Sequence, residues 1–215
     1  AGMGDDQSLP FALQITGTGY LQALVEDPDG RVHTFAANQP LTPGFRRIAL
    51  VRTGGSSRQT RSQSQTYSFT DSEGTEHNVP GDIVEGVDTD EWQDYVFYVD
   101  GVEFGRHRHH GEKPLGNTGP LTIGTAGLRQ NLIGTLSEVR LWSVAREGKE
   151  YGRPIRGGER GLKAWWAFEE KRGNVAYERQ GDYNGQLAHV RHVESPDPLG
   201  STLDLRHNGL PLASE

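Results

Sequence analysis

Short stretches in which apolar and polar residues alternate fill much of this 215-residue chain. In residues 20–26, for example, Leu21, Ala23 and Val25 stand at every second position. A period of two places these side chains on one face of a β-strand, whereas a helix needs a period of 3.6. Glycine occurs 29 times and proline 11 times, and they interrupt every longer apolar stretch. The pattern predicts an all-β protein and excludes a helical bundle.

The turns between these stretches predict antiparallel neighbours. Asp27-Pro28-Asp29-Gly30 combines a proline that presets φ with a glycine that accepts a positive φ. Asp100-Gly101 lies between the apolar residues 95–99 and 102–105 and is typical of a two-residue hairpin turn. Further strands are predicted at residues 10–16, 32–36, 45–52, 121–124, 134–144 and 161–169, and a short helix at 145–151. Antiparallel strands of this kind pack as a sandwich of two sheets.

Residues 54–94 depart from this rhythm. Their first part, from Gly54 to Gln65, consists of glycine, serine, threonine, glutamine and arginine, which cannot pack a core. Only residues 66–70 are predicted to form a short strand. We therefore expect a long loop insertion over residues 54–94, and loops of this length are commonly functional.

Bulk properties exclude several classes of protein. The 22 basic and 29 acidic residues give a formal net charge of −7, which does not favour a nucleic-acid partner. No run of 18 apolar residues is present, so no membrane span is predicted. Cysteine is absent, which excludes disulfides and thiolate chemistry. No leader pattern opens the chain, so a secretion signal is absent or already removed, and we expect the chain to be part of a longer protein or assembly.

Four motifs, in order, resemble laminin-G-like domains of the concanavalin A-like lectin/glucanase superfamily. They are the hairpin Tyr98-Val99-Asp100-Gly101, the segments 121–124 and 132–146, the strand Gly161-Leu162-Lys163-Ala164-Trp165-Trp166, and Asp182-Tyr183-Asn184-Gly185. The resemblance covers residues 11–187 and implies an antiparallel two-sheet jelly-roll sandwich (concanavalin A-like). It also implies that the aromatic residues Tyr98, Trp142, Trp166 and Phe168 lie in the core.

The resemblance departs from the family pattern at both ends. The strands that usually open such a domain are not found before Gly4, and Leu203-Asp204-Leu205 resembles the first of them. We therefore expect a sandwich over residues 1–187 that lacks its usual first strands. The tail, residues 188–215, would supply a strand that completes this domain or a neighbouring repeat.

Calcium is an expectation that comes from the resemblance. Some relatives hold Ca²⁺ at the rim of the sandwich with carboxylate, amide and backbone oxygens. The corresponding metal-binding positions here are Asp204, Asn208 and Ser137. Serine supplies a hydroxyl at position 137 where the family has a carboxylate, which weakens the site. The aspartates of the two turns described above are interpreted as turn formers.

Candidate ligand-binding residues gather where residues 54–94 return to the predicted sheet. Trp92 lies between Asp90 and Asp94, and Tyr95 follows. An exposed aromatic ring beside carboxylates can stack on a sugar while the carboxylates bind its hydroxyls. In the other interpretation, Trp92 packs beneath the long loop and anchors it.

A second candidate is the histidine cluster that follows the hairpin. On a strand, His107 and His109 share one face, where such a pair can bind zinc or meet an acidic glycan or protein. The simpler interpretation is a solvated strand end.

Catalysis has weak support. Retaining glycosidases need two carboxylates about 5–5.5 Å apart. The nearest candidate, residues 85–91, has a different spacing and contains glycine. Glu138 and Arg140 share a strand face and favour an ion pair instead.

These features predict a non-catalytic, glycan-binding recognition module of a larger bacterial surface or secreted protein, located outside the cell. The alternative is a structural or assembly module that binds protein subunits through residues 54–94. A glycoside hydrolase is a third reading. The expected partner is a glycan or a protein, and the expected metal, if there is one, is Ca²⁺.

Overall fold

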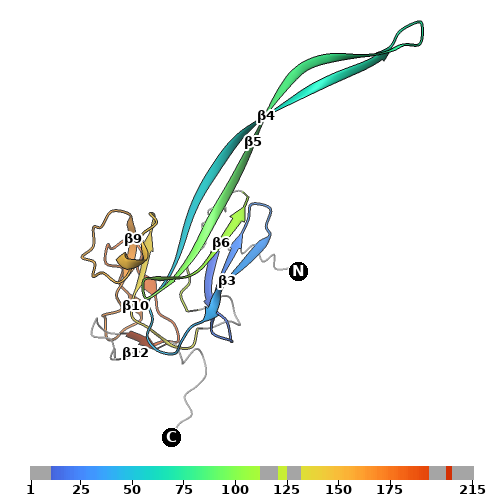
Figure 1. Ribbon diagram of the computed structural model, residues 1–215. Coiled ribbons are helices and arrows are strands. Elements are labelled where there is room, and N and C mark those ends of the chain that lie inside the picture. The colour runs from blue at the N-terminus through green and yellow to red at the C-terminus, as the bar shows by residue number, and fades with distance from the viewer. Residues whose placement is uncertain (1–10, 112–120, 125–131, 194–201, 205–215) are drawn as a thin grey trace, which may run out of the picture.

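The computed structural model describes residues 11–111, 121–124, 132–193 and 202–204, and these form an all-β protein (Figure 1). The first half contains six strands: β1 (Phe11–Ile15), β2 (Tyr20–Glu26), β3 (Val32–Pro40), β4 (Ile48–Thr70), β5 (Glu76–Val99) and β6 (Val102–His110). The described part of the second half contains the 3-10 helix η1 (Gly148–Glu150) and short strands: β7 (Thr135–Leu136), β8 (Val139–Trp142), β9 (Leu162–Trp166), β10 (Val175–Ala176), β11 (Gly185–Gln186), β12 (Arg191–Val193) and β13 (Thr202–Asp204). The helix predicted at residues 145–151 is therefore a single 3-10 turn.

The described strand pairs are antiparallel, in the sheets β1-β2-β3, β4-β5-β6, β8-β9, β10-β11 and β12-β13-β7. Two hairpins form as their turn residues predict. Asp100 and Gly101 both have positive φ, at 50° and 84°, as a type I′ turn requires. In the turn between β2 and β3, the amides of Asp29 and Arg31 donate to the carboxylate of Asp27 at 3.0 and 2.8 Å.

The first core lies between the sheets β1-β2-β3 and β4-β5-β6. Leu21, Ala23, Ala37 and Phe97 are each less than 5% exposed and form one cluster. The two sheets approach closely at Gly105, where an added Cβ atom would lie 3.1 Å from the Cα atom of Ala37. This packing confirms the predicted antiparallel sandwich. On β1 the outcome differs, since its predicted apolar face remains 40–52% exposed at Phe11, Leu13 and Ile15.

A second core forms around β9. Trp166 and Phe168 are 6% and 3% exposed, as predicted, and the Trp166 indole N–H donates to the carbonyl of Tyr183 at 2.9 Å. The other two aromatic residues expected in the core are half-buried. The guanidinium carbon of Arg146 lies over Trp142, 4.0 Å from the centroid of the indole ring. Tyr98 packs against the ring of Tyr151, in the segment after η1.

Two smaller predictions have opposite outcomes. Glu138 and Arg140 form the predicted ion pair, with Nε and Oε1 2.6 Å apart. Residues 121–124, predicted as a strand, form no strand and contain a bend at Ile123 and Gly124.

In the tail, β13 pairs with β12 and with β7, so residues 202–204 add a strand to a sheet of this same chain.

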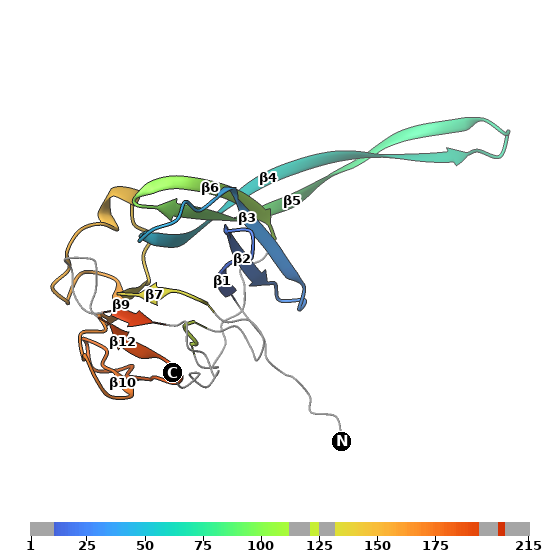
Figure 2. The same ribbon diagram turned by 90° about the horizontal axis from the view of Figure 1, so that it is seen from below.

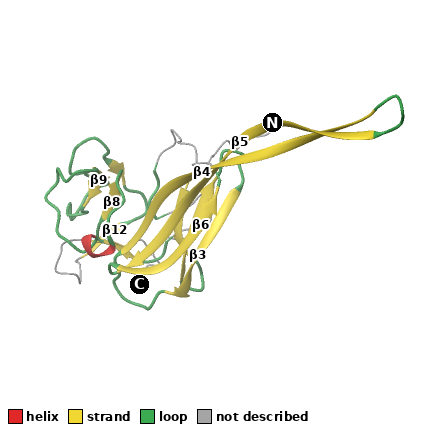
Figure 3. Ribbon diagram, turned by 45° about the horizontal axis from the view of Figure 1, so that its top comes forward, coloured by secondary structure: helices red, strands yellow, loops and turns green. Residues whose placement is uncertain are grey.

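Residues 54–94 are not a loop, which corrects the prediction for this segment. β4 and β5 remain in antiparallel register from the pair Ile48–Val99 to the pair Thr70–Glu76 and form one long hairpin (Figure 2). The pairing of β6 with β5 ends at the pair Trp92–His110. Beyond this pair, β4 and β5 project away from the rest of the molecule (Figure 3). We call residues 56–91 the arm. At about 3.3 Å per residue its strands extend roughly 50 Å.

The sequence pattern misses the arm for a physical reason. Apolar and polar residues alternate along a strand when one face of the sheet is buried, and both faces of an isolated ribbon meet water. Proline at position 80 fits this open arrangement, because its missing N–H is tolerated where a strand has a free edge. It lies beside the register shift between Ser64 and Thr66.

Candidate functional site

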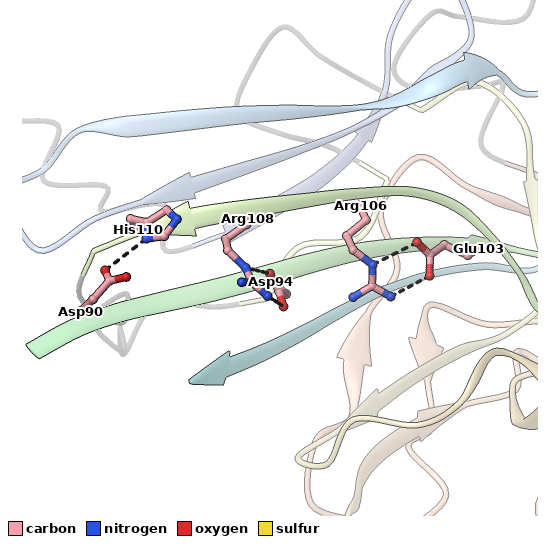
Figure 4. Close-up of polar contacts among 6 residues, drawn as sticks. All are labelled: Asp90, Asp94, Glu103, Arg106, Arg108 and His110. Carbon is pink, nitrogen blue, oxygen red and sulfur yellow. Dashed lines mark hydrogen bonds and ion pairs between the residues drawn. The ribbon is translucent and has the colours of Figure 1, made fainter. Parts of the chain in front are cut away.

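The root of the arm carries several of the predicted ligand-binding residues. On the outer face of β5 and β6, cross-strand register places Asp94 opposite Arg108 and Trp92 opposite His110. We call this surface the outer ladder, and its members are Asp90, Trp92, Asp94, Glu103, Arg106, Arg108 and His110. Figure 4 shows all of these residues except Trp92.

Ion pairs connect the charged members of the outer ladder. Arg108 donates from Nε and from a terminal nitrogen to the two carboxylate oxygens of Asp94, both at 2.8 Å. This hydrogen bonding holds the pKa of the Asp94 carboxyl below its usual value and raises that of Arg108. Glu103 pairs with Arg106 at 2.7 Å, and Asp90 with His110 at 3.1 Å. Because the basic partners are exposed, these pairs contribute little to stability and present alternating charges to solvent.

Trp92 is half-buried and lies against the backbone of β4. Its ring covers Gly55, where an added Cβ atom would lie 2.5 Å from the indole. The guanidinium carbon of Arg108 is 5.1 Å from the ring centroid, within cation–π range. The ring is thus held by these two contacts, and the residue as a whole remains partly exposed. Whether it stacks on a sugar stays a prediction.

An open hollow lies beside Trp92, along Gly54 and Gly55 of β4. It has a volume of about 460 Å³ and is lined by Arg52, Thr53, Gly54, Gly55, Ser56, Glu91 and Gln93. A second hollow of about 380 Å³ adjoins it at Thr89, Asp90, Glu91 and Gly111. Both face solvent at the root of the arm, so a ligand there would be held on a surface.

Sequence reasoning missed the two glycines and Gln93 as parts of this region. The sequence pattern predicts Gly54-Gly55 as the start of a loop, whereas the register of β4 against β5 places these residues opposite Gln93 and Trp92. The link between Asp94 and Arg108, 14 positions apart, likewise follows from register. A signal in the sequence was the glycine pair itself, since glycine within a strand marks a close approach.

The remaining three predicted ligand-binding residues lie on the opposite, inner face. Tyr95 is 2% exposed, and its ring stacks on Phe35 of β3 with centroids 5.0 Å apart. His107 lies with Nε2 2.5 Å from the carbonyl oxygen of Ala36. His109 shares this face, as predicted. The structure therefore divides the six residues between two faces of one sheet, and Tyr95, His107 and His109 pack against β3.

The inner position sets the charge state of His109. Its ring centroid is 4.1 Å from that of His33 and 6.0 Å from that of Phe35. Burial lowers the pKa of His109 below its ordinary value of 6.5, and the nearby His33 lowers it further. Asp27 opposes this to a smaller extent, and His110 adds the smallest lowering effect. The folded protein therefore favours neutral His109.

We expect the protein to lose stability as pH falls below about 6.5, with a contribution from His109. In this range the unfolded chain protonates the residue first, so acid favours unfolding. Urea unfolding of the native protein between pH 7.5 and 5, values around the ordinary histidine pKa of about 6.5, measures the effect. His109→Gln should flatten the pH dependence, and His110→Gln, at an exposed neighbour, is the control. An unchanged slope in His109→Gln would contradict this.

The predicted calcium ligands lie elsewhere. Asp204 belongs to β13, and Ser137 follows the end of β7, the strand paired with β13. Asn208 lies outside the described residues. In the described part of the chain, no three His, Asp or Glu side chains come together as a metal site. A calcium site takes six to eight oxygen ligands, and calcium binding at these positions stays a prediction.

The fold and this surface define an antiparallel β-sandwich protein whose candidate site is exposed at the root of a projecting hairpin. Residues 40–150 match the model of the laminin-G type of the concanavalin A-like lectin/glucanases superfamily. The match covers more than half of the chain, and the protein belongs to this family. Comparison with curated proteins and with solved structures gives no match. Among the described residues, no helix has the length and apolar character needed to cross a membrane.

Proposed function

We propose that this chain is a non-catalytic recognition module that binds another protein through its arm. The observation that carries the proposal is that β4 and β5 continue for fourteen register pairs after the pairing of β6 has ended. Among the described strands, none pairs with either strand of the arm as a third member over that length. Laminin-G-like domains commonly bind carbohydrates or proteins, so a protein partner is within the range of the family.

The energetics of a two-stranded ribbon support the proposal. An isolated two-stranded hairpin is at best marginally stable in water, because each residue fixed costs about 1–2 kcal/mol of conformational entropy. The side chains of the arm that the structure describes form no apolar core that repays this cost. Its described side chains are nearly all exposed. A partner that covers one face, or adds a strand to an open edge, would supply the missing burial.

The test compares the native protein with a variant in which an Asn-Gly turn replaces residues 56–91, which keeps Gly55 paired with Trp92. The variant should keep its melting temperature, because the core around Leu21 and Phe97 lies outside the arm. Affinity capture from extracts of the source cells, followed by rebinding of each captured protein in purified form, should yield a partner of the native protein alone. Equal rebinding to both proteins would contradict a role for the arm.

A glycan site at the arm root is the second candidate function, and the half-exposed ring of Trp92 beside the open hollow favours it. A glycan array probed with and without calcium tests it on the native protein, on Trp92→Ala and on Trp92→Phe. Stacking on a sugar predicts loss of binding in the alanine variant and partial retention in the phenylalanine variant. Glycan binding that survives Trp92→Ala would exclude this ring as the site.

The proposal places the module outside the cell, as part of a larger bacterial surface or secreted protein. The support is that laminin-G-like domains are often extracellular. Because the superfamily includes glycosidases, a polysaccharide-cleavage assay belongs to the same set of tests. Measured cleavage would contradict the non-catalytic assignment.

A further inference from the structure

The net charge of the protein is concentrated in the arm. Residues 56–91 contain two arginines and eight carboxylates, which account for −6 of the total of −7. Both arginines belong to β4, and six of the eight carboxylates belong to β5. The rest of the chain is close to neutral, with 20 basic and 21 acidic residues. A surface of this kind attracts positively charged partners and repels acidic ones.

One face of the arm near its tip is apolar and aromatic. Register places Tyr67 opposite Val79 and Phe69 opposite His77, so the four side chains share a face that we call the tip face. The rings of Phe69 and His77 stack with centroids 5.2 Å apart. Tyr67, Phe69 and Val79 are nevertheless 58%, 54% and 45% exposed. Exposed aromatic groups gathered on a polar element mark an interaction surface.

The turn beyond the tip face holds it in a defined shape. The carboxylate of Asp71 accepts hydrogen bonds from the amides of Glu73 and Thr75 at 3.0 and 2.9 Å. Its second oxygen lies 2.7 Å from Nε2 of His77, a member of the tip face. This is the bonding pattern of Asp27 in the turn between β2 and β3. A preformed tip loses less conformational entropy when it binds.

A second copy of the chain does not suit this surface. If two copies met through their arms, two segments with a formal net charge of −6 each would repel one another. The rest of the chain is nearly neutral and offers no compensating positive charge. We infer that the arm docks onto a protein that presents a positively charged surface with an apolar pocket. The pocket receives Tyr67 and Phe69, and the basic groups meet the carboxylates of β5. This inference rests on the proposed function, in which the arm is the binding element.

The experiment uses the full chain and three labelled synthetic peptides of equal length, with alternating Lys-Val, Lys-Ser or Glu-Val. Fluorescence anisotropy should show that the Lys-Val peptide binds and that its affinity falls between about 0.05 and 0.5 M salt, because salt screens the charge pairs. The double variant Tyr67→Ser, Phe69→Ser should weaken binding about tenfold or more, since aromatic anchors dominate such contacts. Val102→Ser, at an exposed apolar position outside the arm, should leave the affinity unchanged.

Several results would overturn the inference. If the Lys-Val peptide does not bind, or if the Glu-Val peptide binds equally well, the partner does not present a positively charged surface. If the Lys-Ser peptide binds equally well, or if the double variant keeps its affinity for the Lys-Val peptide, the partner does not need an apolar pocket. A dimer in sedimentation equilibrium that disappears when residues 56–91 are replaced would make the occupant a second copy, while leaving the arm as a protein-binding element. Failure of the proposed function is seen separately, as equal rebinding of captured proteins to the native and arm-deleted chains.

Discussion

Replacing Gly148 with alanine should lower the free energy of unfolding by about 2–3 kcal/mol, at the upper end of the range for overpacking. Gly148, the first residue of η1, lies against the tight turn between β5 and β6. An added Cβ atom would lie 2.1 Å from the carbonyl oxygen of Gly101 and 2.8 Å from the ring of Tyr98. The oxygen belongs to the backbone of a type I′ turn, so it cannot move aside as the end of a side chain would.

The predicted loss has a structural consequence that can be measured. This contact joins the hairpin of the first core to the segment that packs Tyr151 on Tyr98. Urea unfolding gives the stability, and near-ultraviolet circular dichroism reports the tyrosine environment. Gly152→Ala is the matched control, because the nearest atom to its added Cβ is the end of the Arg47 side chain at 3.6 Å. Equal stability of the two variants would contradict the argument.

Glu178→Gln should also destabilise the protein, by about 3 kcal/mol, since a buried charged acceptor with several partners is lost. Glu178 is 4% exposed. Its Oε1 accepts from the amide of Trp165 at 2.7 Å, and its Oε2 accepts from the amides of Gln180 and Asp182 at 3.0 and 3.3 Å. The amide group of glutamine has one acceptor oxygen, so its NH₂ would face at least one backbone N–H.

The carboxylate of Glu178 thus organises the loop that packs over β9. The amide of Glu178 itself donates to the side chain of Asn184, which ties the start of this loop to its end. Glu169→Gln provides the control, because Glu169 forms an exposed ion pair with Arg179 and should cost less than about 0.5 kcal/mol. Thermal unfolding compares the two, and a melting temperature that is the same in both variants would refute the role of Glu178.

The strands of the first core could be predicted from the sequence because each buries one face. Leu21, Ala23 and Val25 occupy alternate positions and are 0–1% exposed in the folded protein. Asp100-Gly101 could be predicted as a turn because few residue pairs accept two positive φ angles. The arm could not, since a ribbon exposed on both faces leaves no alternation for the pattern to detect.

The candidate site could be predicted in part. Trp92, Asp90 and Asp94 lie together on the outer ladder because alternate residues of one strand share a face. The same rule places Tyr95, which follows Asp94 directly on β5, on the opposite face. The hydrophobic cluster between the sheets decides which of the two faces is buried. The partners of the site residues lie on other strands, so their identity depends on register.

The sequence by itself therefore determined the class of the fold and its turns, because these depend on local periodicity and on which residues accept a given φ. The family was indicated by the resemblance of four sequence motifs and is shown by the match over residues 40–150. It also determined the charge of −6 on residues 56–91, which is a matter of composition. Tertiary structure decided that these residues form an arm, that Gly55 lies beneath Trp92, and that Gly148 meets Gly101. The reason is that pairing register and close approach are set by contacts between segments far apart in the chain, which no local pattern encodes.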